Sequence, residues 1–396
     1  MKRLVCIVLV AFLVLPVSAQ VFPFVRRDRN VLEYPGGRSA EYELFKRKLD
    51  TLLVYGSGDV KVLHIGGSHV QGGTMTDRLR QRFLSLRYGI DGGRGLVFPF
   101  SAAQTNTPVS YVSSWQGRWE GVTCLKPGAE PLGVSGITVT AQDTSARAVI
   151  DLLPKERLIL QPHYSFKSVD VLGHGSLEPV IILNGRDTVN AVKGPEMAHF
   201  LLPYYADWLQ LAFKGSGTFA LRGLYLDRPG AGFTMSEAGI NGASTRSWLD
   251  CSLFYQDLGR VMPDLVLLSI GINDIQGDDF DVRRFKANYK ALIEEIRRVN
   301  PRCAILFTGI NDSWRRRGRG VNEHTAQAEK AFRELAADYH AVFWDWYEVM
   351  GGYDSMSLWV EAGLAQADKV HFTPAGYKKL GDLLFEAIMA DYSGRP

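Results

Sequence analysis

Two kinds of hydrophobic pattern alternate along the chain. In the first kind, short runs of consecutive apolar and β-branched residues are followed by stretches with a helical spacing of apolar positions. The strands predicted in this way are 61–65, 264–270, 304–308 and 342–344, and the helices are 40–53, 74–86, 244–261, 282–299, 322–339 and 374–390. Strands that alternate with helices predict an α/β fold, a three-layer sandwich whose parallel sheet is covered on both faces.

The second kind of pattern occupies the middle of the chain. From about Leu96 to Leu226 helical spacing is scarce, and Gly, Pro, Asn and Asp separate short strand-like runs at 136–141, 148–152, 180–183 and 218–224. This texture is typical of a β-sandwich. We therefore predict an inserted β-rich domain over residues 97–228, within an α/β domain formed by residues 20–96 and 229–396.

The first residues predict a signal peptide over residues 1–19. Lys2 and Arg3 precede an apolar stretch that runs from Leu4 to Val17, and the small residues that end at Ala19 resemble a cleavage site. This stretch is too short to predict a membrane span, and no later segment is long enough. We expect an exported protein, periplasmic or extracellular, with no transmembrane segment after cleavage of the signal.

Charge and cysteine content limit the possible partners. Loss of the signal peptide lowers the formal charge from +3 to +1, so charge gives no reason to expect binding to nucleic acid or to an anionic membrane. Three cysteines remain, Cys124, Cys251 and Cys303. An odd number excludes a fully paired disulfide framework. At most one bridge can form, and the sequence leaves the pair open.

The glycine-rich segment after the first predicted strand carries a candidate nucleophile. In the sequence HIGGSHVQGG, residues 64–73, Ser68 lies on a sharp turn between a strand and a helix. A serine in this position has an exposed hydroxyl, and its backbone N–H can stabilise an oxyanion. Ser68 can equally be a helix N-cap, so the turn alone does not establish catalysis.

A candidate for the partner of this serine lies near the C-terminus, in the sequence DKVHFTPAGY, residues 368–377. A catalytic histidine needs a carboxylate at one ring nitrogen so that the other nitrogen can accept the serine proton. The spacing of three lets Asp368 and His371 meet within one turn. By itself, an Asp-x-x-His pattern is more often a surface turn.

Two further motifs lie between these segments. The sequence AGINGA, residues 238–243, precedes a predicted helix, and SIGIND, residues 269–274, ends a predicted strand. A serine turn on the first strand, a glycine after the second, Gly-x-Asn-Asp after the third and Asp-x-x-His near the C-terminus are the four blocks of SGNH, or GDSL-like, hydrolases. The sequence resembles that family in all four blocks and in their order. The resemblance implies the SGNH hydrolase fold, with a parallel flavodoxin-like sheet.

The resemblance also implies a role for each matching residue. Ser68 would be the nucleophile, His371 the general base, and Asp368 the residue that orients His371. The oxyanion hole would consist of the Ser68 N–H, the Gly242 N–H and the side-chain amide of Asn273. The reaction would be acyl transfer through an acyl-serine that water hydrolyses, and it would need no metal or organic cofactor.

The sequence departs from the family pattern at one position and repeats one of its motifs. The family usually has Asp before the serine, where this chain has Gly67; that aspartate supports the turn and is not the triad acid. The segment 309–312 repeats Gly-Ile-Asn-Asp after the next strand. We prefer Asn273 to Asn311 because its strand directly follows the helix after Gly242.

Other polar and aromatic residues near the motifs receive structural interpretations. We expect His64 to face the core or a helix layer, His69 to pack behind the nucleophile, and the arginine-rich segment 315–319 to be a solvated loop. Asp345 is less suited than Asp368 to orient the histidine. Three aromatic residues near the last strand are expected in the core: Trp344, Trp346 and Trp359.

The length of the insertion indicates a substrate class. Ser68 and Gly242 lie 174 positions apart, and this layout resembles bacterial peptidoglycan O-acetylesterases, which carry a carbohydrate-binding-like β module within the SGNH domain. The predicted function is therefore a carboxylic ester hydrolase that removes O-acetyl groups from peptidoglycan or another extracytoplasmic glycan. Aromatic residues of the insertion can stack on sugar rings, although most are expected in the core: Trp115, Trp119, Tyr164, Tyr204, Tyr205 and Trp208.

Two alternatives stay open. One is a general lipase or acylesterase that acts on lipid or small esters. The other is a glycan-binding protein or an acyltransferase with weak hydrolase activity. The sequence does not determine the acylated substrate, the acyl chain length or the oligomeric state.

Overall fold

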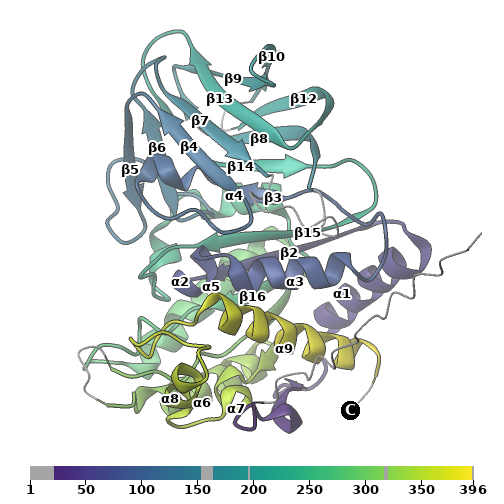
Figure 1. Cartoon of the computed structure of the whole chain (residues 1–396), viewed down its shortest axis with the longest axis vertical. Coiled ribbons are helices and arrows are strands. Elements are labelled where there is room, and N and C mark those ends of the chain that lie inside the picture. Colours follow the sequence, from purple (N-terminus) through teal and green to yellow (C-terminus); the bar gives the residue numbers. More distant parts are fainter. Residues whose placement is uncertain (1–21, 153–163, 195–196, 316–319, 395–396) are drawn as a thin grey trace, which may run out of the picture.

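The computed structural model describes residues 22–152, 164–194, 197–315 and 320–394. The predicted signal peptide, residues 1–19, lies outside these ranges. The chain forms an α/β part, in which helices flank one sheet, and a β-rich part that packs on one side of it (Figure 1). The α/β part comes from the two ends of the sequence, and the β-rich part comes from the middle.

The central sheet of the α/β part has six strands in the order β1-β18-β17-β16-β2-β15. Every neighbouring pair is parallel except the edge pair of β1 and β18. In chain order the five parallel strands are arranged 2-1-3-4-5, the flavodoxin-like order. The predicted fold class is therefore confirmed, with one antiparallel edge strand added. The strands are β1 (Leu32–Glu33), β2 (Asp59–Gly66), β15 (Gly232–Gly239), β16 (Leu265–Ser269), β17 (Ala304–Phe307) and β18 (Val342–Trp344).

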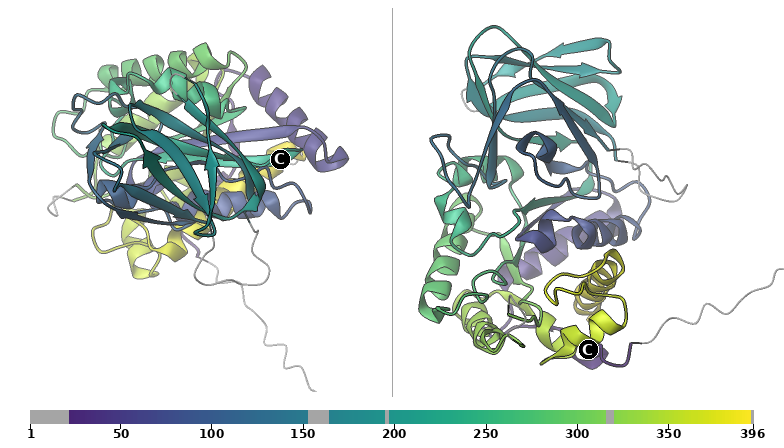
Figure 2. Two further views of the ribbon diagram at one scale, coloured as in Figure 1. Left: turned by 90° about the horizontal axis from the view of Figure 1, so that it is seen from above. Right: turned by 60° about the vertical axis from the view of Figure 1, so that its left-hand side comes forward.

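Helices cover both faces of this sheet, with α1, α3 and α9 on one face and α4, α5 and α6 on the other (Figures 1 and 2). In α5 the buried residues Phe285, Tyr289 and Ile296 recur at helical spacing, and the Asp281 side chain caps the first turn. The α-helices are α1 (Ala40–Asp50), α2 (Ser68–Gln71), α3 (Thr74–Leu84), α4 (Phe254–Val261), α5 (Val282–Val299), α6 (His324–Asp338), α7 (Trp346–Met350), α8 (Ser355–Glu361) and α9 (Pro374–Tyr392). Shorter helical turns are η1 (Arg27–Arg29), η2 (Thr51–Tyr55), η3 (Phe100–Ala103) and η4 (Ser247–Asp250).

The strand β2 has apolar side chains on both of its faces. Val60 and Val62 belong to the core beneath one helix layer, whereas Leu63 and Ile65 belong to the core beneath the other. Side chains alternate between the faces of a strand, and both faces of this sheet are covered. An apolar residue is therefore favoured at nearly every position.

The β-rich part contains two antiparallel sheets. One has the order β10-β9-β13-β7-β4, and the other has the order β11-β12-β8-β14-β6-β5, with β3 paired to β14. The strands are β3 (Gly95–Val97), β4 (Val112–Gln116), β5 (Trp119–Thr123), β6 (Ile137–Ala141), β7 (Arg147–Asp151), β8 (Phe166–Gly175), β9 (Glu178–Leu183), β10 (Asp187–Asn190), β11 (Val192–Lys193), β12 (Met197–Ala206), β13 (Trp208–Lys214) and β14 (Phe219–Asp227). Antiparallel sheets in this region agree with the predicted inserted β-sandwich, although the exact domain bounds stay a prediction.

The two parts share one hydrophobic core. Ile65, Ile240 and Leu268 of the α/β part belong to the same buried cluster as the apolar residues of the β-rich sheets. A buried ion pair between Arg222 of β14 and Asp257 of α4, with an N–O distance of 3.0 Å, joins the parts further. The β-rich part is therefore packed against the α/β part over a substantial buried interface.

Two of the differences between the structure and the predicted elements concern the helix 244–261 and the strand β15. The predicted helix 244–261 is broken into η4 and α4, because Cys251 takes an extended conformation and the Leu253 N–H donates to the Leu132 carbonyl of the β-rich part. The strand β15 was not predicted, because its sequence GFTMSEAG lacks a β-branched run. Both deviations arise from contacts between distant segments.

Two further predictions concern disulfide bonds and membrane-spanning segments. Cys124, Cys251 and Cys303 are buried free thiols. Across the ranges that the structure covers, no helix is both long enough and apolar enough to span a bilayer.

Candidate active site

Ser68 lies where β2 ends and the short helix α2 begins. This junction needs glycine, because a Cβ atom added to Gly66 would lie 2.7 Å from the Ser269 carbonyl oxygen and 2.3 Å from a Val70 methyl group. The strand can therefore pass directly into α2, with Ser68 as its first residue. The serine lies at the carboxyl end of β2, beside the point where the strand order reverses, which is where open α/β sheets bind ligands.

Asp368 and His371 lie on the loop before α9. The Oδ1 atom of Asp368 accepts hydrogen bonds of 3.0 Å from the backbone N–H groups of Val370 and His371. Its Oδ2 atom lies 2.6 Å from the Nδ1 atom of His371. Lys369 has a φ of 54°, so the chain turns tightly between the two residues. The helix then begins at Pro374, with the Thr373 side chain as its cap.

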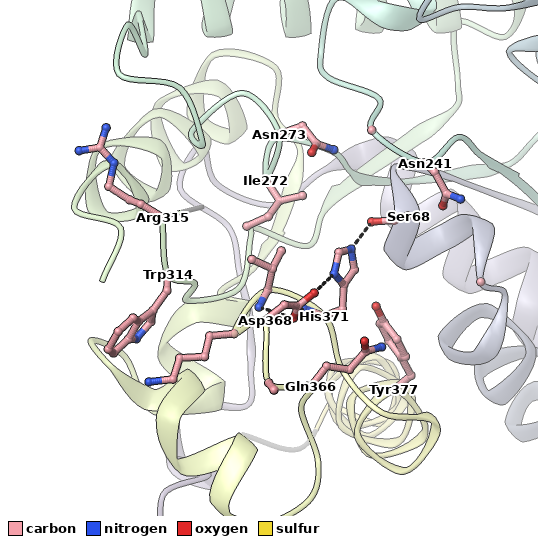
Figure 3. Close-up of a pocket in the computed structure, with 15 residues that line it drawn as sticks. Ser68, Asn241, Ile272, Asn273, Trp314, Arg315, Gln366, Asp368, His371 and Tyr377 are labelled. Atoms are coloured by element: carbon pink, nitrogen blue, oxygen red, sulfur yellow. Dashed lines mark hydrogen bonds and ion pairs between the residues drawn. The ribbon is translucent and has the colours of Figure 1, made fainter. Parts of the chain in front are cut away.

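The structure brings these three side chains into one line (Figure 3). The Ser68 Oγ atom lies 2.9 Å from the Nε2 atom of His371, across 303 positions of sequence. Burial alone raises the pKa of Asp368, but hydrogen bonds from the His371 backbone, the His371 ring and the Val370 backbone bring the pKa below its usual value. An ionised carboxylate at Nδ1 allows the imidazole to accept a proton at Nε2 and stabilises the resulting cation.

Gly242 and Asn273 line the same pocket as Ser68 and His371. The volume of this pocket is about 830 Å³. Gly242 lies in the turn after β15, and Asn273 lies in the loop after β16. The Asn273 Nδ2 atom donates a hydrogen bond of 3.0 Å to the Ala243 carbonyl, which fixes the direction of its amide. Amide donors at the edge of a serine site can stabilise the charge that develops on an ester oxygen.

Asn311, in the repeated motif, is placed differently. Its side chain is fully buried, and its Nδ2 atom donates to the carbonyl oxygens of Asp312 and Val370 at 2.8 and 3.2 Å. It is not among the pocket-lining residues.

The two histidines near the nucleophile are buried. His64 contacts the hydroxyls of Thr76 and Ser269 at 2.8 and 2.7 Å. His69 lies 2.6 Å from the Tyr377 hydroxyl, and its ring centroid is 5.4 Å from that of His371. Burial, followed by the charge of His371, lowers the pKa of His69 to about 3. His69 is therefore neutral at ordinary pH and adds no charge beside His371.

Several pocket residues were missed by the sequence analysis. Asn241, Gln366, Trp314 and Arg315 also line the pocket. Asn241 lies beside Ser68, Gln366 lies near Tyr377, and Trp314 and Arg315 lie on the opposite side (Figure 3). Trp314 is held by a hydrogen bond from its Nε1 atom to Asp354 and carries the Lys369 ammonium over its ring. Asn241 lies within the motif 238–243, where only Gly242 was assigned a role, whereas the other three residues lie on loops without a recognisable motif, so only the fold could bring them together. Arg315, expected in a solvated loop, pairs with Asp278; residues 316–319 lie outside the described ranges.

Other expectations concern residues outside the pocket. Trp344, Trp346 and Trp359 are almost completely buried, as predicted. Asp345 caps α7 and pairs with Arg333. Among the residues that the structure describes, no cluster of three or more histidine, cysteine, aspartate or glutamate side chains could hold a metal ion.

Comparison with protein families gives one sequence match. Residues 212–379 match the model of the GDSL-like Lipase/Acylhydrolase family. This range contains Gly242, Asn273, Asp368 and His371 but not Ser68, because the β-rich part separates the serine from the other motifs. No curated protein shows significant sequence similarity to this chain.

Comparison with solved structures gives a match that extends over nearly the whole chain. A peptidoglycan O-acetylesterase structure is 23% identical and has a TM-score of 0.76, covering 92% of this chain and 99% of that chain. A lipase/acylhydrolase from Enterococcus faecalis is 23% identical, with a TM-score of 0.32 and coverage of 40% and 77%. An acetyl xylan esterase is 18% identical, with a TM-score of 0.31 and coverage of 39% and 81%.

The first of these structures shares the fold of both parts of this protein, whereas the two lower TM-scores carry no argument. Residues 212–379 therefore match the model of the GDSL-like Lipase/Acylhydrolase family, and both parts of the chain share the fold of the peptidoglycan O-acetylesterase structure.

Proposed function

We propose that this protein is an exported serine esterase that removes O-acetyl groups from peptidoglycan or another extracytoplasmic glycan. The observation that carries the proposal is the line of hydrogen bonds from Ser68 through His371 to Asp368, at 2.9 and 2.6 Å, beside a pocket with amide donors. Export is inferred from the pattern of residues 1–19.

In this proposal Ser68 attacks the acetyl carbonyl while His371 takes the hydroxyl proton at Nε2. The negative charge on the carbonyl oxygen is stabilised by the Ser68 N–H, the Gly242 N–H and the Asn273 amide. His371 then gives its proton to the departing sugar oxygen, leaving an acetyl-serine. Water, activated by the same imidazole, releases acetate and restores the serine.

The dimensions and lining of the pocket support a glycan ester. A cavity of about 830 Å³ is much larger than an acetyl group requires, so it has room for a sugar unit beside the serine. The side chains of Asn241, Asn273 and Gln366 in its lining can exchange hydrogen bonds with hydroxyl groups. Apolar side chains, including Ile272 and Val370, also line the pocket, so the preference for acyl chain length has to be measured.

The β-rich part gives further support. The peptidoglycan O-acetylesterase that matches this fold covers the β-rich part as well as the α/β part. Of the aromatic residues considered for sugar stacking, Trp115, Tyr204 and Tyr205 are exposed, Trp119 and Trp208 are half-buried, and Tyr164 is buried. Three exposed rings on this part are available to contact a polymer.

Acetate release from O-acetylated peptidoglycan tests the proposal. The wild-type protein is expected to release acetate, and the Ser68→Ala variant is expected to release none above background. The Ser252→Ala variant, which changes an exposed serine before α4, is the matched control and should retain activity. A fluorophosphonate probe should label the wild type and the control but not Ser68→Ala.

Chain-length preference separates the proposal from the lipase alternative. p-Nitrophenyl acetate is expected to be cleaved faster than longer esters. High activity on long-chain esters alone would contradict the proposed substrate class, and labelling that persists in Ser68→Ala would contradict the assigned nucleophile.

A further inference from the structure

The turn that carries Gly242 has two possible backbone arrangements. The Ala243 N–H donates to the Ile240 carbonyl at 2.9 Å, which closes a β-turn, and Gly242 has a φ of 85°. A positive φ at the third position is typical of a type II turn. Type I and type II turns differ by a flip of the central peptide, which here joins Asn241 to Gly242.

Because glycine tolerates both arrangements, the turn alone does not fix the direction of the Gly242 N–H. With the Gly242 N–H as an oxyanion donor, as in the proposed function, a flip would aim it away from the pocket and turn the Asn241 carbonyl oxygen toward the substrate. An oxygen there would repel the charge that develops on the substrate. The site therefore needs groups that hold the turn in one arrangement.

Two side-chain amides hold Asn241 in place. The Oε1 atom of Gln71 accepts the backbone N–H of Asn241 at 2.6 Å. The Oδ1 atom of Asn106 accepts the side-chain Nδ2 of Asn241, also at 2.6 Å. The Nε2 atom of Gln71 in turn donates to the backbone carbonyl and the Oδ1 atom of Asn106, at 3.0 and 3.2 Å. The three amides form a closed set of hydrogen bonds.

These residues come from three distant parts of the chain. Gln71 is almost fully buried, with 1% of its surface exposed, and lies three residues after Ser68 on α2. Asn106 lies on the segment 104–109, between η3 and β4, which leads into the β-rich part. This segment also contacts the nucleophile's helix, because the Val109 N–H donates to the Gly72 carbonyl at 3.2 Å.

The strand that leads into the turn is pressed against the same helix. A Cβ atom added to Gly239, the last residue of β15, would lie 2.2 Å from the Gln71 backbone nitrogen. The serine helix, the turn and the segment 104–109 are therefore in mutual contact. A change in the position of one is transmitted to the others.

We propose that Gln71 and Asn106 are positioning residues that hold Asn241, and through it the turn that presents the Gly242 N–H to the substrate oxygen. This inference rests on the proposed serine esterase function. It gives the segment that leads into the β-rich part a role in catalysis that is separate from any binding of glycan by that part.

The experiment compares Gln71→Met and Asn106→Leu with the wild type. Both variants lose hydrogen bonds to Asn241, and kcat for p-nitrophenyl acetate is expected to fall by about tenfold to a hundredfold, with KM nearly unchanged. The affinity for a trifluoromethyl ketone, which forms a serine-bound oxyanion, should weaken by a similar factor. A purely structural role would not produce this parallel change.

Two further variants act as controls. Asn106→Asp keeps an oxygen that accepts both N–H groups and is expected to retain activity within about threefold of wild type. Asn30 also donates to a backbone carbonyl, at Leu383, and accepts an N–H, from Trp344. Because Asn30 is not among the pocket-lining residues, Asn30→Leu should lower stability while leaving kcat and inhibitor affinity unchanged.

The outcomes separate this inference from the proposed function. If Ser68→Ala keeps the wild-type rate, the proposed function fails. If Ser68→Ala is inactive but Gln71→Met and Asn106→Leu keep the wild-type kcat and inhibitor affinity, the positioning role is overturned and the esterase function stands. Asn106 is exposed, so Asn106→Leu decides the question if Gln71→Met does not fold.

Discussion

The tetrapeptide Gly-Ile-Asn-Asp occurs twice, at 271–274 and 309–312, each time directly after a strand of the parallel sheet. The strands β16 and β17 are neighbours, and both motifs begin with a glycine at positive φ. Asn273 nevertheless lines the pocket beside Ser68, whereas Asn311 is fully buried and binds the Val370 carbonyl.

The difference between the motifs comes from what covers them. The first lies at the point where the strand order reverses, so the serine helix and the turn 240–243 leave a cavity above it. The second is covered by the loop that carries His371 and by α8, whose Met356 N–H donates to the Asp312 carboxylate. A local sequence can therefore supply the same amide for chemistry or for support, depending on its neighbours.

Among substitutions in the two motifs, we expect the largest effect on activity from removal of the Asn273 amide, which lines the pocket. Asn273→Ala is expected to lower kcat for p-nitrophenyl acetate by about a hundredfold to a thousandfold, because one donor to the oxyanion is lost. Stability should change little, since Asn273 is only partly buried. Steady-state kinetics and urea unfolding measure the two effects. A near-normal kcat would remove Asn273 from the proposed oxyanion hole.

The corresponding change in the second motif should act mainly on stability. Asn311→Leu leaves the buried Val370 carbonyl without its amide donor, so the free energy of unfolding should fall by about 1–3 kcal/mol. We expect kcat to fall less than in Asn273→Ala, because Asn311 does not line the pocket and contacts the loop before His371. If Asn311→Leu had the larger effect on kcat and no effect on unfolding, the contrast between the motifs would be wrong.

The buried carboxyl group of Asp312, in the second motif, should make the stability of the protein depend on pH. Burial raises the pKa of Asp312 to about 6, whereas an aspartate in an unfolded chain has a pKa of about 3.9. Between these values the folded protein holds more protons, so this contribution to stability is present at acid pH and is lost as pH rises through about 6. As pH rises through this window, the free energy of unfolding of the wild type should fall by up to about 1.4 kcal/mol per pH unit relative to that of Asp312→Asn.

Urea unfolding of the wild type and Asp312→Asn from pH 4 to pH 7 measures that difference. Asp28→Asn, which removes an exposed carboxylate, is the control for the loss of one charge. A difference that is constant with pH would show that Asp312 does not titrate in this range.

The smallest expected effects come from shortening the isoleucine of each motif, Ile272 or Ile310. Ile272 and Ile310 are both buried, but only Ile272 also lines the pocket. Each Ile→Val change should cost about 0.5–1.5 kcal/mol of unfolding free energy. Only Ile272→Val should also alter KM for the glycan substrate. Equal KM values for the two variants would indicate that the substrate does not reach Ile272.

Elements whose sequences carry a complete local signal were predicted well. The helix α5 matches its predicted range, 282–299, because the Asp281 cap and the spacing of Phe285 and Tyr289 specify it locally. The strand β18 also matches its predicted range, 342–344. By contrast, β15 contains Ser236 and Glu237, whose burial depends on groups from elsewhere in the chain: Arg94 pairs with Glu237, and the Leu96 N–H donates to the Ser236 hydroxyl.

In the candidate site, too, some residues could be identified from local motifs and others could not. Ser68, Asp368 and His371 could be named from the sequence because they occur in recognisable motifs at the ends of predicted elements. Their catalytic roles stay a proposal, supported by the 2.9 and 2.6 Å contacts among them. The roles that we infer for Gln71 and Asn106 had no local signal, because a single Gln or Asn gains meaning only from the amide placed opposite it.

Local sequence patterns predicted most helices and strands of the α/β part and the four motifs of the candidate site, since backbone propensity and hydrophobic spacing are local properties; the bounds of the insertion stay a prediction. Only the tertiary structure showed what covers the second Gly-Ile-Asn-Asp motif and how the segment 104–109 reaches the turn at Asn241. Those outcomes depend on strand order and on contacts between segments far apart in the sequence, and no local pattern encodes them.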